Sequence, residues 1–210
     1  MTTMTTTQNK KSGKGISDGV VSEMAVFFGV KPGHEEDLRA AVARFAEVVR
    51  KSDSQATQKT GLRDSRHVIF DNGQRVLWVT TFETDWDPYL DDALILVGVE
   101  HFIDWMQHIT QATELTTWLE SAGGAEKLTK SSVAEFEQTV KGTSGGLKAI
   151  LQANQVPAAG YWNALADQTI PQIRKAQRVE QAFQRVLDNP EAEQALQHPA
   201  LEPLLEQAAD

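Results

Sequence analysis

The spacing of apolar and polar residues changes along this chain, and each change marks a predicted element. An apolar run over residues 24–31, closed by Pro32 and Gly33, predicts a buried strand that ends in a turn. A helix is predicted from about residue 35, because acids at 35–37 suit its first turn and apolar residues recur at helical spacing as far as Val49. Residues 52–63 are polar and without a period, which predicts a loop.

A hairpin is predicted next. Residues 66–70 and 75–82 are rich in β-branched and aromatic side chains, and Asn72-Gly73 between them favours a tight turn. Residues 89–109 predict one long helix, with Pro88 in its first turn and Asp87 as its cap. Residues 110–155 predict further helices, interrupted by glycine pairs at 123–124 and 145–146. A strand over 156–165 and a helix over 170–187 are predicted after them.

This order of elements predicts an α+β fold. Without the helical insert at about 110–155 it is the β-α-β-β-α-β order of a ferredoxin-like antiparallel sheet with helices on one face. Residues 1–21, rich in Thr, Lys, Gly and Ser, predict a disordered leader. Residues 22–188 then form a single ferredoxin-like domain with its insert, and residues 189–210 form an acidic helical tail.

The first predicted strand is apolar on both faces, since Val26 and Phe28 alternate with Ala25 and Phe27. A sheet that met water on one face would be more polar there. Two copies packed sheet to sheet would cover the second face, so we expect a homodimer that closes into a dimeric α+β barrel.

Composition removes several classes of function. The 210 residues hold 20 Lys and Arg against 29 Asp and Glu, a net charge of −9, so we expect no nucleic acid partner. The chain has no cysteine, which excludes thiolate catalysis, disulfides and Cys-ligated metals. The longest apolar run, residues 93–99, is shorter than the roughly 18 to 20 residues of a membrane span. With no secretory pattern in the opening residues, we expect a cytoplasmic protein with no membrane partner.

Three stretches resemble a known superfamily. These are residues 66–71, residues 79–83 leading to 86–92, and residues 173–178. They are similar to bacterial proteins of the dimeric α+β-barrel superfamily, which includes chlorite dismutases, dye-decolourising peroxidases, antibiotic-biosynthesis monooxygenases and muconolactone isomerases. The resemblance covers roughly residues 24–188 and is closest to a bacterial group with an Arg on the second strand and a Tyr-Leu-Asp-Asp run after the third. Arg66 and residues 89–92 match that group, whereas Arg63 and Glu83-Thr84 replace its His and its Asp-Gly pair.

The resemblance implies a barrel that holds a small ligand or haem. We therefore expect a small-molecule-binding protein, with an oxidoreductase of the haem-dependent peroxidase or cofactor-free monooxygenase kind as its enzymatic form, acting on a hydrophobic or aromatic substrate. His67 or His101 would be the axial ligand if haem were bound. The candidate pocket residues are Arg66, His67, Trp78, Tyr89, His101 and Trp105.

Each candidate also has a purely structural interpretation. Arg66 and His67 are adjacent on a strand and point to opposite faces, so only one can face a pocket. His101, Trp105 and His108 share a helical face, but the two histidines lie about 10.5 Å apart along the axis, too far to ligate one ion.

An acidic group over residues 83–92 fits helix capping better than cation binding, so no metal site is predicted. The alternative function is a non-catalytic binding or scaffold protein that uses its helical insert and acidic tail to hold a partner.

Overall fold

The computed structural model describes residues 13, 15–124 and 133–209. It divides into two compact units, residues 1–169 and residues 170–210. The helix predicted over 170–187 therefore belongs to the C-terminal unit. Most of the predicted leader, residues 1–12 and 14, lies outside the described residues, and its last part contains a short strand, β1.

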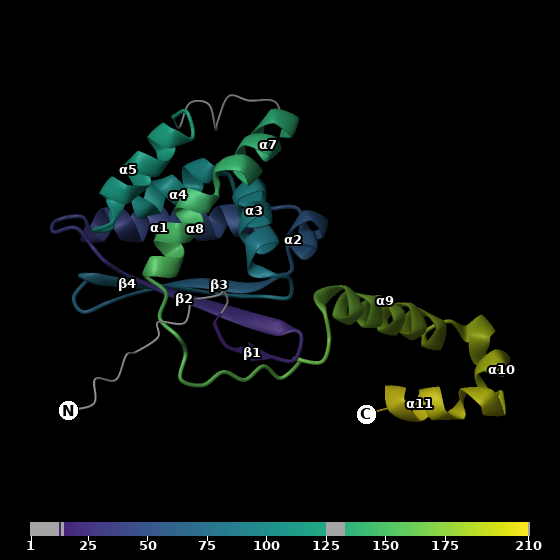
Figure 1. Ribbon diagram of the computed structural model, residues 1–210. Coiled ribbons are helices and arrows are strands. Elements are labelled where there is room, and N and C mark those ends of the chain that lie inside the picture. Colours follow the sequence, from purple (N-terminus) through teal and green to yellow (C-terminus); the bar gives the residue numbers. More distant parts are fainter. Residues whose placement is uncertain (1–12, 14, 125–132, 210) are drawn as a thin grey trace, which may run out of the picture. The chain divides into compact units, whose positions relative to one another are not determined.

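A four-stranded sheet carries the N-terminal unit, and its strands are β1 (Ser17–Asp18), β2 (Val21–Gly29), β3 (Leu62–Phe70) and β4 (Arg75–Phe82). Their order is β1-β2-β4-β3, and every neighbouring pair is antiparallel. The predicted α+β class with an antiparallel sheet is confirmed. Since Trp78 on β4 stands opposite both Val26 and His67, these three side chains share the face that the helices cover (Figure 1).

The predicted hairpin between β3 and β4 is confirmed. Asp71 and Asn72 both adopt positive φ, 55° and 53°, and the amide of Gly73 donates to the Phe70 carbonyl over 3.1 Å. Asp, Asn and Gly tolerate this left-handed geometry better than other residues, and it matches the twist of the two strands.

Helices lie over one face of the sheet (Figure 1). Their bounds are α1 (Glu35–Lys51), α2 (Ser54–Thr60), α3 (Trp86–Val97), α4 (Val99–Met106), α5 (Ala112–Ser121), α7 (Val133–Thr143) and α8 (Gly145–Ala153). The last three lie within residues 110–155, where the sequence predicts helices. In the part of the chain that the structure describes, no helix is long and apolar enough to cross a membrane.

The prediction of a loop over 52–63 is wrong, because α2 and the start of β3 occupy it. The Asp53 carboxylate accepts from the amides of Gln55 and Ala56 at 3.0 and 2.9 Å and so caps the helix. Gly61 ends it in the left-handed conformation at φ 73°. Both capping residues are visible in the sequence, but a helix of 7 residues is too short to show an apolar period.

The single helix predicted over 89–109 is also wrong. It is two helices, α3 and α4, separated at Gly98, whose φ is 91°. A residue with a side chain is strained at this φ, and glycine is not. The break turns α4 onto α1, where Arg44 and Asp104 form a two-pronged ion pair at 2.8 and 2.9 Å.

The strand predicted over 156–165 is not formed. Only Gln155 makes a bridge, to Val26, and the Val156 amide donates to the Ala25 carbonyl over 2.9 Å. Pro157 follows and has no N–H to continue the ladder. The edge of β2 away from β4 therefore pairs with β1 and makes only this short contact with residues 155–156. A ferredoxin-like order would place a complete last strand along this edge.

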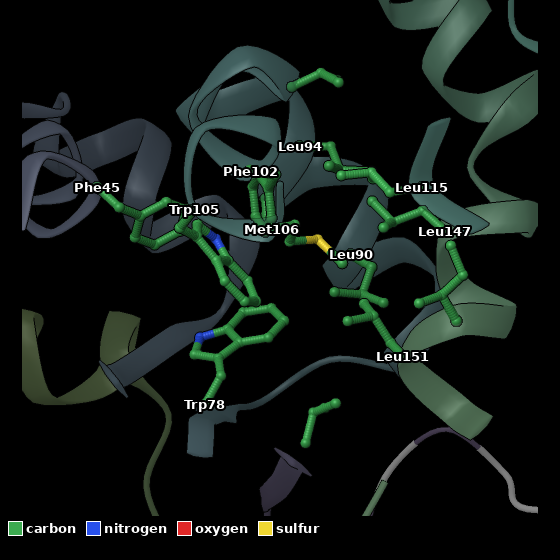
Figure 2. Packing of buried hydrophobic residues seen from close by; sticks show 14 of the residues in the cluster. Phe45, Trp78, Leu90, Leu94, Phe102, Trp105, Met106, Leu115, Leu147 and Leu151 are labelled. Carbon is green, nitrogen blue, oxygen red and sulfur yellow. The ribbon is translucent and has the colours of Figure 1, made fainter. Parts of the chain in front are cut away.

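The core lies between the sheet and the helices (Figure 2). Trp78 from β4 meets Trp105 from α4, with ring centroids 5.8 Å apart, and Phe102 and Phe45 make an edge-on contact at 5.0 Å. Aliphatic side chains from α3, α5 and α8 continue the core beyond this aromatic group, and include Leu90, Leu94, Leu115, Leu147 and Leu151. Burial of this size accounts for the stability of the unit.

The C-terminal unit consists of helices only. Its elements are α9 (Ile170–Leu187), α10 (Glu193–Leu196), α11 (Glu202–Ala208) and the two 3-10 turns Pro190–Ala192 and Pro199–Leu201. The helix predicted over 170–187 is therefore confirmed with the same bounds. None of these elements has a buried residue, and Val179 on α9 is 58% exposed.

Candidate functional site

A cavity of about 560 Å³ opens between α1, α2 and the edge strand β3. Its walls are mainly apolar, because one stripe of α1 faces the helix side of β3. Val42, Phe45 and Val49 line it from α1, and Leu62 and Ile69 line it from β3. A cavity of this size and polarity suits a small organic molecule.

His67 is the polar group set most deeply in this wall. Its ring stacks on Trp78 at 5.9 Å and meets Trp105 and Phe45 edge-on at 4.9 and 5.3 Å. The residue is half-buried, but its Nε2 atom is covered and has no hydrogen-bond partner among the described residues. A buried nitrogen without a partner is costly, which marks His67 as a group that a ligand could satisfy.

The charge state of His67 follows from these neighbours. Desolvation by the surrounding rings lowers the pKa of His67 to about 3. The imidazole is therefore neutral near pH 7. A neutral imidazole offers one donor and one acceptor, so His67 can orient a ligand by a hydrogen bond but is a weak base.

Arginines surround the cavity. Arg63 is held by Glu83, with Nε 2.5 Å from Oε1, and also donates to the carbonyl oxygens of Leu165 and Gln168. Arg66 is exposed and makes no ion pair or side-chain hydrogen bond within the described residues. The cavity wall is thus apolar with a charged border. Arg39 and Arg50 also belong to this border, but each is ion-paired with a glutamate of α1, and Asp64 adds a carboxylate.

Arg66 and His67 are the two predicted pocket residues that border this cavity. They pair across the ladder with Val79 and Trp78 respectively, so their side chains leave β3 on opposite faces. The predicted opposition of the two side chains is confirmed. Because β3 is an edge strand, residues from both of its faces can border the cavity.

The aromatic candidates lie elsewhere. Trp78 and Trp105 belong to the fully buried core, and the Trp78 indole donates to Ser65 Oγ over 2.9 Å. Tyr89 is also buried: it stacks on Phe82 at 4.3 Å and shares a hydrogen bond with Thr80. Burial raises the pKa of Tyr89 further above its ordinary value, so it stays protonated. None of the three lines the cavity.

His101 lies on α4, away from the cavity lining. Its side chain is 32% exposed, and its Nε2 is 3.9 Å from a carboxylate oxygen of the neighbouring Glu100. The structure therefore does not bring His101 and His67 together around one pocket.

The two histidines do not fit a haem. An axial ligand needs an open coordination position on its free nitrogen. Nε2 of His67 is covered by the neighbouring side chains, and His101 does not border the cavity.

Three carboxylates of the acidic group over residues 83–92 form ion pairs with cations of the chain. Lys148 Nζ lies 2.9 Å from Asp91 Oδ1 and 3.1 Å from Asp87 Oδ1, and Glu83 pairs with Arg63. Lys148 comes from α8, so the insert is anchored to α3 by charge as well as by apolar contacts. The ion pairs account for these carboxylates as structural groups.

The spacing of apolar residues in the sequence did not identify the residues that α1 contributes to the cavity. Val42 and Val49 lie on its apolar stripe, and the structure leaves them half-buried along the cavity. The sequence of β3 does contain a local signal for the cavity. A strand buried entirely in the core would carry apolar residues on this face, but β3 carries Ser65 and His67 there. Comparison with models of known families, with curated proteins and with solved structures finds no match to this chain.

Proposed function

We propose that this protein binds a small hydrophobic or aromatic molecule in the cavity between α1, α2 and β3. The observation that carries the proposal is the combination of apolar walls, a covered and unpartnered His67 nitrogen and bordering arginines. The walls would take the apolar body of the ligand, and Arg66 would favour an acidic group near the border. His67 would donate or accept one hydrogen bond once the rings around it adjust.

An aromatic sulfonate, 1-anilinonaphthalene-8-sulfonate, is a suitable first probe, because its fluorescence rises on transfer to an apolar site. Ala46 borders the cavity, so Ala46→Phe should fill part of it and weaken binding about tenfold. Ala40 is an exposed residue of the same helix outside the cavity lining, and Ala40→Phe is the matched control. Equal affinity in the two variants would refute the cavity as the binding site.

The dimeric barrel remains part of this proposal. The sheet face away from the helices carries half-buried Phe27 and Leu77, together with Val68 and Phe70 at 42% and 39% exposure. A second copy packed on this face would cover them. Light scattering should find a dimer that Val68→Glu dissociates, whereas Gln74→Glu, the same charge in the exposed turn, should leave it intact.

An oxidoreductase acting on the bound molecule is the enzymatic form of the proposal. His67 would orient the substrate in a cofactor-free oxygenation, because its depressed pKa makes it a poor base. Oxygen uptake with 1,4-dihydroxynaphthalene as the aromatic reductant tests this form, and Ala46→Phe should reduce it in parallel with binding. Because neither histidine fits a haem, a haemin titration should give no ligand-shifted Soret band, and such a band lost in His67→Ala would overturn this expectation.

The alternative, a scaffold that holds a partner, is favoured by one observation in the C-terminal unit. A groove of about 480 Å³ between α9 and α11 is lined mainly by apolar atoms, with Val179 and Leu204 exposed by 58% and 46%. Such a groove suits an amphipathic helix. If Val179→Asp abolishes the fluorescence of the probe and Ala46→Phe does not, the probe binds in the groove between α9 and α11 and not in the cavity at β3. That result would favour the scaffold function.

A further inference from the structure

Two segments at one end of the sheet, residues 34–37 and residue 108, bring together three side chains of types that ligate metal ions. His34 and Asp37 stand at the start of α1, and His108 stands just after α4. One nitrogen or oxygen atom from each lies within 4.8 Å of the other two. These residues line neither wall of the cavity at β3.

The imidazole rings of His34 and His108 approach each other through their Nδ1 atoms. His34 Nδ1 is 2.9 Å from His108 Nδ1, and the ring centroids are 5.2 Å apart. Two nitrogens bound to one tetrahedral zinc ion at about 2.0 Å would lie about 3.3 Å apart. The observed separation thus needs only a small adjustment for both lone pairs to reach one ion.

The backbone holds these loops in place before any ligand arrives. The Lys31 amide donates to the His108 carbonyl over 2.9 Å, and the His34 amide donates to the Lys31 carbonyl over 3.0 Å. Val30 makes a bridge with Ile109, and the Thr110 amide donates to the Gly29 carbonyl. The two histidines are therefore presented by one hydrogen-bonded junction, which lowers the entropy cost of binding an ion.

Two carboxylates near the junction favour a cation, whereas the positive charge of Lys31 beside His34 and His108 opposes it. Asp37 supplies a carboxylate with no ion pair among the described residues. Asp104 also lies nearby, but its carboxylate is ion-paired with Arg44. It therefore adds negative electrostatic potential at the site and supplies no ligand atom.

We propose that His34, Asp37 and His108 form a binding site for a divalent transition-metal ion of the zinc type. Two imidazoles and one carboxylate leave at least one coordination position for water or another ligand, the pattern of an open site rather than a closed structural one. The same histidines border a cavity of about 660 Å³ with polar residues such as Gln107, Thr116 and Glu120, so that position would be reachable.

The competing explanation is a plain hydrogen bond between the two rings, with the proton on one Nδ1 and the lone pair on the other. It predicts no affinity for metal ions. The two explanations therefore differ in a quantity that can be measured on the intact chain.

The experiment titrates the untagged, chelator-treated full-length protein with zinc chloride in competition with a chromophoric chelator. We expect one equivalent to bind, and His34→Gln and His108→Gln each to weaken binding at least about tenfold. Asp37→Asn keeps the fold, because its side chain is exposed, and should weaken binding less. His101→Gln, on α4 but outside the site, is the control and should bind as the wild type does.

A second measurement needs no variant. The chain has 5 histidines, so the ring nitrogens can be followed individually by ¹⁵N NMR. Zinc should shift Nδ1 of His34 and His108 and leave the other three rings unchanged. The proposal is overturned if no stoichiometric binding occurs, if the His34 and His108 variants bind as well as the wild type, or if other histidines shift instead.

Discussion

His67 links the cavity to the pH dependence of the whole protein. Its ring is neutral in the folded state because apolar neighbours desolvate it, whereas in the unfolded chain it titrates near its ordinary pKa of 6.5. Between about pH 3 and 6.5 the unfolded state therefore binds more protons than the folded state. The unfavourable contribution of His67 to the free energy of folding is therefore absent above pH 6.5 and grows as the pH falls towards 3.

We predict that His67 alone costs the folded protein about 2 kcal/mol between pH 7 and pH 5. His67→Phe removes the titrating group and keeps an aromatic ring. Urea unfolding of the variant should therefore show a smaller loss of free energy between the two pH values than the wild type shows. An equal loss in both proteins would contradict the prediction and place the pH dependence in other groups.

A second prediction concerns Lys148, the cation that joins the insert to α3. Lys148→Met leaves Asp91, whose side chain is 17% exposed, without its partner, and should lower the free energy of unfolding by about 1 to 3 kcal/mol. Asp87 contacts the same lysine but is 74% exposed, so Asp87→Asn should cost less than about 1 kcal/mol. Urea denaturation at neutral pH compares the two, and equal losses would show that burial does not govern this ion pair.

At the scale of elements, the break between α3 and α4 depends on one residue. Gly98 has φ 91° and ψ 133°, where a side chain is strained, and an added Cβ would meet the Glu100 carboxylate 2.6 Å away. We predict that Gly98→Ala lowers stability by about 1 to 3 kcal/mol. Thermal unfolding followed by circular dichroism would measure it.

The control for this prediction is another glycine. Gly142 lies within α7, and a Cβ there would meet nothing within 4 Å. Gly142→Ala should therefore raise stability by about 0.5 to 1 kcal/mol through helix propensity. If both substitutions act in the same direction, the special backbone of Gly98 is not what separates α3 from α4.

At the scale of the whole molecule, the two units differ in how much they bury. The N-terminal unit has a continuous apolar core, whereas no residue of α9 is buried. We predict that backbone amides of α9 exchange with deuterium within seconds, while those of β4 are protected for hours or longer. Strong protection of α9 would instead show that a second chain or a ligand covers its apolar side in solution.

The amino-acid sequence by itself determined the local elements whose signals are complete within a few residues. The hairpin at 66–82 follows from alternating apolar strands and a turn of Asp, Asn and Gly. The helix at 170–187 is predicted with Pro171 in its first turn, and the structure has the same bounds. The α+β class follows from the order of these elements. The opposition of Arg66 and His67 follows from strand geometry alone, because adjacent side chains point to opposite faces.

Only the tertiary structure decided what depends on contacts between distant segments. Gln155 and Val156 meet β2 for only a short stretch, so the expected last strand is absent, and the cavity exists because α1 stands off the edge strand β3. His34 and His108 are 74 residues apart, so no spacing rule could pair them. Local sequence patterns determine secondary-structure propensity and the face on which each side chain lies. Packing between segments that are distant in the sequence determines which side chains share a site.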